Sequence, residues 1–430
     1  MKISLKLIST LLAAFATVAV AFSQTSTIRP TSSPYSMYGY GMLNDQATAI
    51  QRQMGGIGYG MNFGKQINPM NPASYAAIDS LTFLWDIGAD ITFFNRREND
   101  VNGEDLKGHG LGGGLDYLAM QFPVGRHFGM SAGLVPWSSV GYSFGKEVIH
   151  GNLSNQGSGG VTEAYLGFSG RYKGLSLGFN VSYNFGNVIN DIYANTAAGH
   201  STLFEHVMQI RDWNIMLGLQ YSQLIGPYNR ATIGAVYSPK KTMRGHTWGA
   251  YWDITADSKA DTVGYMNIKN HYYQPNTFGI GLNYTHTRSR RVMVEADFTY
   301  QDWSKAAFDP LRDANGDIVV EGQQFNNRFK IAVGGEFIPK LRGNYLQRVA
   351  YRAGFFYNRD YIKVGTNQLK DFGISCGFGF PTPEGRTMVN LGFEYKHRQA
   401  SPQALVKENY FGITLGLSFN EMWFWQRKIK

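Results

Sequence analysis

A single cysteine, Cys376, is present among the 430 residues of the chain. A disulfide bond within the chain is therefore excluded, and no cysteine stands near the amino terminus to carry a lipid. Cys376 lies among apolar residues, which indicates an inert packing role rather than redox chemistry.

Long apolar stretches are also missing after the first residues of the chain, although a helix that spans a bilayer takes about 20 of them. Charged residues make up only 17% of the chain, whereas there are 51 glycines and 14% aromatic residues. Because glycine costs about 1 kcal/mol in a helix interior, this composition disfavours a soluble helical enzyme. It suits strands with small side chains facing a lumen and aromatic girdles at two membrane interfaces.

Patterns typical of catalysis or metal binding are absent as well. The nine histidines do not form pairs with the helical spacing of a metal site. The glycine-rich stretch 111–114 begins a predicted strand, and no helix follows it that could hold a phosphate. We therefore expect no enzyme, no cofactor and no metal site.

The formal net charge is +9, but the basic residues are scattered over predicted turns and loops. Without a basic stripe, nucleic-acid binding is not predicted. Attraction to acidic lipid head groups is a more natural use of this charge.

Residues 1–23 have the pattern of a secretory signal peptide. Lys2 and Lys6 form a basic start, an apolar stretch covers 11–22, and small residues precede Gln24 as a cleavage site. A membrane anchor is the alternative, but the apolar stretch is shorter than the roughly 20 residues that span a bilayer.

Strict alternation of apolar with small or polar residues is the clearest structural signal. Near the carboxyl end Phe411, Ile413 and Leu415 alternate with Gly412 and Thr414. One face of such a strand is apolar and the other carries glycine and polar groups. A soluble sandwich also alternates, so the period alone leaves sandwich and barrel open.

The connections between strands favour a barrel, because short and long links alternate as they do between periplasmic turns and external loops. Long links are predicted at 95–110, 144–160, 188–205, 245–271 and 303–324. An all-β, 14-stranded antiparallel transmembrane barrel (81–419) is predicted, with both termini in the periplasm of a Gram-negative cell. The predicted strands are 81–94, 111–123, 127–143, 161–172, 174–187, 206–223, 229–244, 272–286, 290–302, 325–338, 347–358, 368–380, 386–397 and 407–419.

Two segments do not fit the strand pattern. Residues 24–80 are rich in glycine, asparagine and proline, and they form either a disordered periplasmic tail or, as we expect, a compact plug (hatch) inside the lumen. Residues 420–430 combine an aromatic cluster with cations, which fits a periplasmic tail at the membrane–water interface.

The segment 24–80 carries a resemblance to a known family. It resembles the plug of the long-chain fatty acid transporter family (FadL-like outer-membrane barrels), which has a Met-Gly-Gly motif ahead of an Asn-Pro-Ala motif and then the first of fourteen strands. The matching positions are Met54, Gly55, Gly56, Asn68, Pro69, Asn71, Pro72 and Ala73.

A proline stands inside the third predicted strand, where it lacks the N–H that a paired strand needs. Pro136 either begins the extracellular part of this strand or marks a local break. The family resemblance implies the second reading, with Gly133 and Pro136 at an inward kink that opens a lateral gap in the wall.

Charged residues are predicted to face the lumen. They either form a proton or ion pathway or pair across the lumen and hold the plug, and the second role is favoured because unpaired buried charges are costly. These residues are Glu295, Asp297, Glu336, Arg352, Glu394 and Lys396.

The resemblance implies passive uptake of hydrophobic compounds such as fatty acids, with exit through the lateral gap into outer-membrane lipid. The alternative is a structural or shuttle subunit of an outer-membrane protein secretion or assembly machine. The aromatic residues in and beside 245–271 would then contact protein partners. A general diffusion pore is disfavoured by the plug.

Overall fold

The computed structural model describes most of the chain from residue 33 to residue 422. The predicted signal peptide and most of the predicted tail 420–430 lie outside the described residues, and no described helix is long and apolar enough to cross a membrane. The described ranges are 33–99, 105–148, 151–196, 201–254, 260–268, 272–312, 316–320, 322–383 and 386–422.

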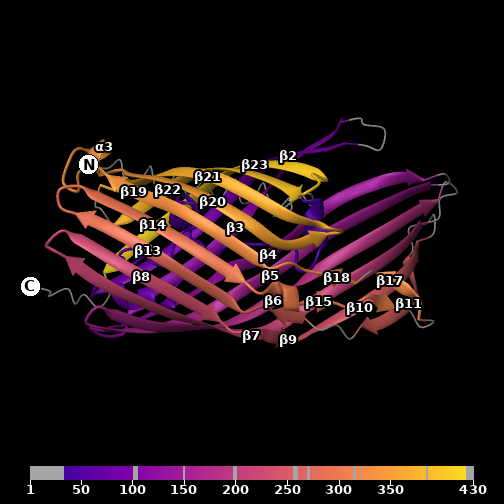
Figure 1. Cartoon of the computed structure of the whole chain (residues 1–430), viewed down its shortest axis with the longest axis horizontal. Helices are drawn as coiled ribbons and strands as arrows, with labels where there is room; N and C mark the ends of the chain where they lie inside the picture. The colour runs from indigo at the N-terminus through magenta and orange to yellow at the C-terminus, as the bar shows by residue number, and fades with distance from the viewer. Residues whose placement is uncertain are drawn as a thin grey trace, which may run out of the picture.

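Fourteen antiparallel strands close into a barrel (Figure 1), which confirms the predicted fold class. The wall closes where the first of these strands, β2, pairs with the last, β23, from Thr82–Met422 to Glu98–Val406. The wall strands are β2 (Thr82–Asn99), β3 (Asp105–Pro123), β4 (Phe128–Val148), β5 (Gly151–Tyr172), β6 (Leu175–Thr196), β7 (Ser201–Ile225), β8 (Asn229–Ser238), β13 (Thr277–Thr287), β14 (Arg291–Gln301), β19 (Arg328–Ile338), β20 (Ala350–Val364), β21 (Asn367–Pro381), β22 (Thr387–Ser401) and β23 (Val406–Met422).

Shorter strands and helices lie between or inside the wall strands. Three more strands complete a 17-stranded sheet: β1 (Met42–Leu43), which pairs with β4, and the hairpin β10 (Gly245–Ile254) and β11 (Ala260–Ile268). The remaining elements are β9 (Lys241–Met243), β12 (Tyr272–Gln274), β15 (Ala307–Phe308), β16 (Leu311–Arg312), β17 (Ile318–Val320), β18 (Gln323–Gln324), the short helices α2 (Ala49–Arg52) and α3 (Tyr345–Arg348), and the 3-10 helices η1 (Pro34–Met37), η2 (Pro72–Ala77) and η3 (Trp303–Lys305).

The alternating pattern places apolar side chains on the outside of the barrel. On β6, Leu177 and Phe179 are 57% and 43% exposed, whereas Ser176 and Asn180 point inward and are buried. This is the reverse of a soluble sandwich, whose apolar faces are its interior. An apolar exterior around a polar interior is the arrangement of a barrel that faces lipid.

Several strands run further than the alternation predicts. β4 and β5 pair as far as Val148–Gly151, and β10 pairs with β7 as far as Ile254–Ser201. The predicted long loops 95–110, 144–160, 188–205 and 245–271 are therefore wrong over most of their length. In Figure 1 these strands extend past β13 and β14 at one end of the barrel, which we call the outer end.

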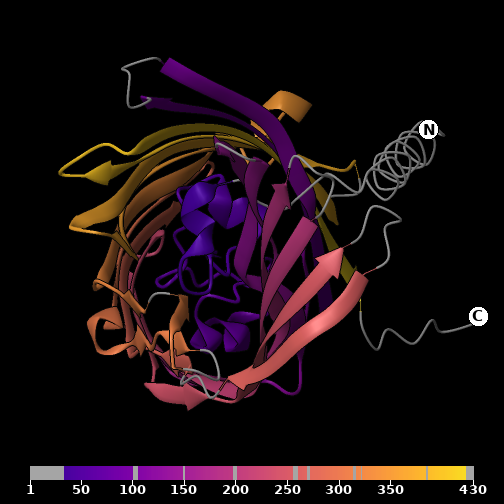
Figure 2. The same ribbon diagram turned by 90° about the vertical axis from the view of Figure 1, so that its right-hand side faces the viewer.

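The amino-terminal segment, residues 33–80, lies inside the ring of strands (Figure 2). Its side chains are largely buried, including Tyr40, Met54 and Tyr75, each with no more than trace exposure. The segment ends at the start of β2, so the chain passes from the lumen directly into the wall.

Candidate functional site

The Met-Gly-Gly motif lies against β19 and β20 in the lumen. Gly55 and Gly56 have φ angles of +75° and +76°, a region that glycine adopts without steric cost. A Cβ on Gly55 would stand 2.8 Å from the carbonyl oxygen of Phe355. The Gly55 N–H donates to the Ser375 hydroxyl over 2.8 Å. Glycine is thus required where the segment touches the wall.

The two Asn-Pro motifs organise the next turn of the segment. The Asn68 side chain donates to the Gly58 carbonyl over 2.6 Å, and Pro69 beside it is buried. Asn71 caps η2 by accepting from the Ala73 N–H over 3.0 Å, and Pro72 opens that helix. These side chains supply partners for backbone groups that are buried away from water.

Glu295 and Asp297 on β14 hold the segment through its backbone. Glu295 accepts from the Gly60 N–H over 2.7 Å, and Asp297 accepts from the N–H groups of Gly58 and Tyr59 over 2.7 and 3.0 Å. Together the two carboxyl groups accept three backbone N–H groups of the segment, which would otherwise be buried without partners.

Arg352 on β20 joins the segment to the wall from the other side. It lies 2.8 Å from Glu336, and it donates to Gln53 of the segment and to Asn390, each over 2.8 Å. Arg291 reaches the same Glu336 at 3.3 Å. The charge of Glu336 is therefore shared between two guanidinium groups.

The other two predicted lumen residues lie apart from this contact. Glu394 and Lys396 line two small cavities of about 120 and 110 Å³ between the segment and β22. The Lys396 ammonium lies 4.9 Å from the centre of the Tyr410 ring.

Asp45 of the segment forms an ion-pair cluster that the sequence did not reveal. Its carboxylate contacts Lys330 and lies 3.5 Å from the Arg328 guanidinium. Burial alone would raise the pKa of Asp45, but the two cations lower that pKa to about 2. An acidic residue in a polar segment has no local signature, and its partners are far away in the sequence.

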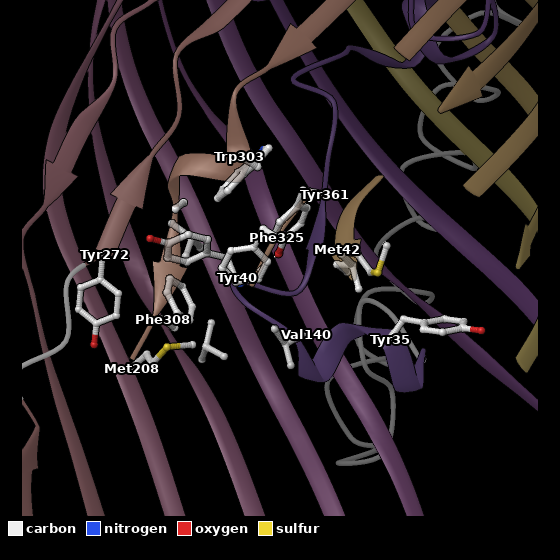
Figure 3. Packing of buried hydrophobic residues seen from close by; sticks show 14 of the residues in the cluster. Tyr35, Tyr40, Met42, Val140, Met208, Tyr272, Trp303, Phe308, Phe325 and Tyr361 are labelled. Atoms are coloured by element: carbon white, nitrogen blue, oxygen red, sulfur yellow. Dashed lines mark hydrogen bonds between the residues drawn. The ribbon is translucent and has the colours of Figure 1, made fainter. Parts of the chain in front are cut away.

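An aromatic cluster lies at the outer end of the lumen, and Figure 3 shows how its side chains pack. Tyr40, Trp303 and Tyr361 are completely buried. The rings of Trp303 and Tyr361 stack with centres 4.4 Å apart, and Tyr361 donates to the Gly41 carbonyl over 2.6 Å. In this cluster the amino-terminal segment packs against the connection between β14 and β19 and against β20.

The wall itself is interrupted between β3 and β4. These strands pair only from Pro123–Gly129 to Leu118–Leu134, whereas β4 and β5 pair along their whole length apart from a bulge after Pro136. A Cβ on Gly133 would lie 2.5 Å from the Leu118 carbonyl oxygen. Gly133 therefore stands at the last close contact, and Pro136 stands just past it.

A bulge on β3 turns charge toward the lumen at this break. Gly88 of β2 pairs with Tyr117 and Ala89 with Leu115, which leaves Asp116 as the extra residue. β-Bulges re-aim side chains in this way. Asp116 meets Arg52 of the segment at 2.8 Å, while Leu115 faces outward and is 68% exposed.

Behind the break lies a cavity with a volume of about 660 Å³. Its lining combines apolar and charged side chains. The apolar ones include Leu115, Leu118, Leu134, Val135 and Ile189, and the charged ones are Arg52, Asp90 and Asp116.

Within the described ranges, no cluster of three or more His, Cys, Asp or Glu side chains could hold a metal ion.

Comparisons with known proteins identify both a family and a fold. The model of the BamG family matches residues 5–430, and no curated protein sequence matches the chain. Among solved structures, the toluene transporter TodX of P. putida superposes with a TM-score of 0.62 at 16% identity, covering 89% of this chain and 100% of TodX.

Two further solved structures share this architecture. The CymD monoaromatic hydrocarbon channel has a TM-score of 0.57 at 15% identity, covering 88% of this chain and 99% of CymD. A FadL homologue of Pseudomonas aeruginosa has a TM-score of 0.58 at 12% identity, covering 89% of this chain and 99% of its own. At such identities the likeness shows the fold, and in fold the chain is FadL-like as its motifs predict.

Proposed function

The chain belongs to the BamG family, and we propose that it lies in the outer membrane and passes hydrophobic compounds between its lumen and the lipid. The observation that carries this proposal is the cavity of about 660 Å³ behind the break between β3 and β4. Known binding pockets for small ligands are concave, mostly apolar and of comparable size.

The route follows from where the wall is interrupted. The aromatic cluster around Tyr40 and Trp303 packs at the outer end of the lumen, whereas the cavity reaches Leu115 and Leu134 on the membrane side. Structures with this fold include channels for monoaromatic hydrocarbons and a toluene transporter. Fold alone does not fix function, so the site geometry has to be tested directly.

In this proposal the predicted motif residues act as anchors. Met54, Gly55 and Gly56 seat the segment on β20, and the Asn-Pro turns fold it. Glu295, Asp297, Glu336 and Arg352 hold it by hydrogen bonds and ion pairs. A fixed segment keeps the back wall of the cavity in place, including Arg52.

Filling the cavity tests the route. A Cβ on Gly114 meets nothing within 4 Å, although Gly114 lines the cavity. Gly114→Leu should therefore lower uptake of a fluorescent long-chain fatty acid analogue severalfold, because the new side chain starts from an open Cβ position and occupies the ligand's space.

Gly264→Leu is the matched control, since its Cβ finds only an ordinary contact of 3.7 Å on the β10–β11 hairpin. It should leave uptake unchanged. Unchanged uptake in Gly114→Leu, with the barrel folded, would exclude the cavity as the route.

A second function, as a subunit of an outer-membrane protein secretion or assembly machine, is favoured by two observations. The family model that matches is BamG rather than that of a hydrocarbon channel. The β10–β11 hairpin also presents Val263 and Tyr265, which are 71% and 57% exposed. Isolation in mild detergent followed by mass spectrometry separates the two: bound hydrophobic compounds support passage, and stoichiometric protein partners support the subunit.

A further inference from the structure

The break has two strand edges, one on β4 and one on β3, and only the β4 edge is paired with another part of the chain. The edge of β4 is covered by the amino-terminal segment: Met42 pairs with Ser139 and Leu43 with Ser138. The Ser33 N–H also donates to the Gly141 carbonyl over 2.8 Å. The chain thus supplies a short strand of its own, β1, to the β4 edge, which forms one lip (one bordering strand edge) of the opening.

The opposite lip, the edge of β3, has no such cover. In the part of the chain that the structure describes, β3 pairs with β2 on one side, but no strand and no other backbone group pairs with its second edge between Gly108 and Asp116. In a strand, alternate N–H and C=O groups point to each edge. This lip therefore offers a row of free donors and acceptors.

The unpaired edge begins at membrane depth. A strand that spans the membrane takes about 9–11 residues. The β3–β4 ladder runs only from Pro123 to Leu118 on β3, which is shorter than this length. Backbone groups without partners are costly in lipid. An edge strand of this kind is a template for pairing with another chain.

The two faces of β3 indicate which side chains a strand paired with its free edge would need. Leu111 and Leu115 point outward and are 40% and 68% exposed. The inward side opens on the cavity with its Arg52–Asp116 ion pair. A neighbour in this position needs apolar side chains toward lipid and small or polar side chains toward the lumen, which is the pattern of an outer-membrane barrel strand.

We infer that the free edge of β3 between Gly108 and Asp116 docks an amphipathic β-strand of another outer-membrane protein. The strand adds to the sheet antiparallel to β3, where β4 would otherwise continue. Main-chain hydrogen bonds supply the affinity, and the alternating side chains supply the specificity. This goes beyond the passage of compounds, because a compound fills the cavity whereas the strand pairs along its lip.

Cross-linking of a defined peptide tests the inference. The full chain carries Cys376→Ser, which removes the native exposed thiol, and Leu115→Cys labelled with a benzophenone. The probe is a synthetic peptide of residues 407–420 of this chain, an amphipathic strand of the required pattern. The control peptide has the same sequence with three alternate amides N-methylated, so that it stays apolar but cannot pair along one edge.

The expected result is cross-linking of the unmodified peptide and roughly tenfold less of the methylated one, because each lost backbone hydrogen bond weakens pairing severalfold. The same label at Leu177→Cys, on a strand paired on both edges, should capture neither peptide. Equal capture of both peptides, capture of neither, or cross-links to phospholipid alone would each overturn the inference.

Discussion

Single residues decide how closely the amino-terminal segment approaches the wall. Gly55 combines a φ angle of +75° with a Cβ position 2.8 Å from the Phe355 carbonyl oxygen. Gly55→Ala should destabilise the folded protein by about 1–3 kcal/mol, since both backbone strain and a clash result. Heat-induced unfolding in detergent measures this loss.

Gly365→Ala is the control for that measurement. Its φ angle is also positive, at +61°, but nothing lies near its Cβ position. It should cost only the backbone strain, about 1–2 kcal/mol or less. Equal losses at the two positions would mean that the contact of Gly55 with β20 contributes nothing.

The Asp45 cluster predicts a pH dependence. The pKa of Asp45 falls from 3.8 to about 2 because Lys330 and Arg328 outweigh the effect of burial. A carboxyl with a lowered pKa stabilises the fold fully above its unfolded pKa and loses this effect as the pH falls through the folded pKa. Asp45→Asn should therefore unfold at a lower temperature than wild type above about pH 4, and the difference should vanish near pH 2.

Asp302→Asn controls for general charge effects, since its partner Lys305, at 2.7 Å, is largely exposed. Exposed pairs contribute little, so this variant should follow wild type at every pH. A gap between Asp45→Asn and wild type that persists at the acid end would contradict the proposed ion pairs.

At the scale of elements, the connections of the outer end are held by the aromatic cluster. Trp303 of η3 is completely buried between Tyr40 and Tyr361. Trp303→Ala should cost about 3–5 kcal/mol of unfolding free energy, the usual loss for a large buried aromatic side chain. Trp85→Ala should cost less, because Trp85 is 37% exposed on the outer wall. Similar losses would show that the cluster does not hold these connections together.

The fourteen strands could be predicted because each has its own alternation, as in Leu177 and Phe179 against Ser176 and Asn180. How far these strands extend at the outer end of the barrel could not be predicted. The stretch 151–160 is rich in glycine, serine and asparagine, which are poor strand formers, and it is extended because β4 and β6 pair with it on both sides. Tertiary pairing here overrides local propensity.

The site was only partly accessible from the sequence. The family resemblance implies a break at Gly133 and Pro136, and the β3–β4 ladder ends at Leu134. The bulge that turns Asp116 toward Arg52 could not be predicted from the alternation of apolar and polar residues. Contacts such as Asp45 with Lys330 join residues far apart in the sequence, and no local periodicity encodes them. The roles of the plug motif and lumen residues stay predictions.

At the scale of the whole molecule, the barrel is asymmetric along its axis. Short turns join the strands at one end, such as 124–127 between β3 and β4, whereas β4 to β7 and the β10–β11 hairpin extend at the other. Outer-membrane barrels place tight turns in the periplasm and long connections outside. The hairpin should therefore face the medium and the turns the periplasm.

A matched pair of valines tests this orientation. Val263 on the hairpin is 71% exposed and Val124 in the short turn is 53% exposed, so either accepts a cysteine without a packing change. In a Cys376→Ser background, a maleimide that cannot cross membranes should label Val263→Cys on intact cells, because the hairpin stands clear of the lipid. Val124→Cys should react only after the outer membrane is permeabilised. The reverse pattern would invert the barrel, and labelling of both on intact cells would mean that the protein is not inserted in the outer membrane.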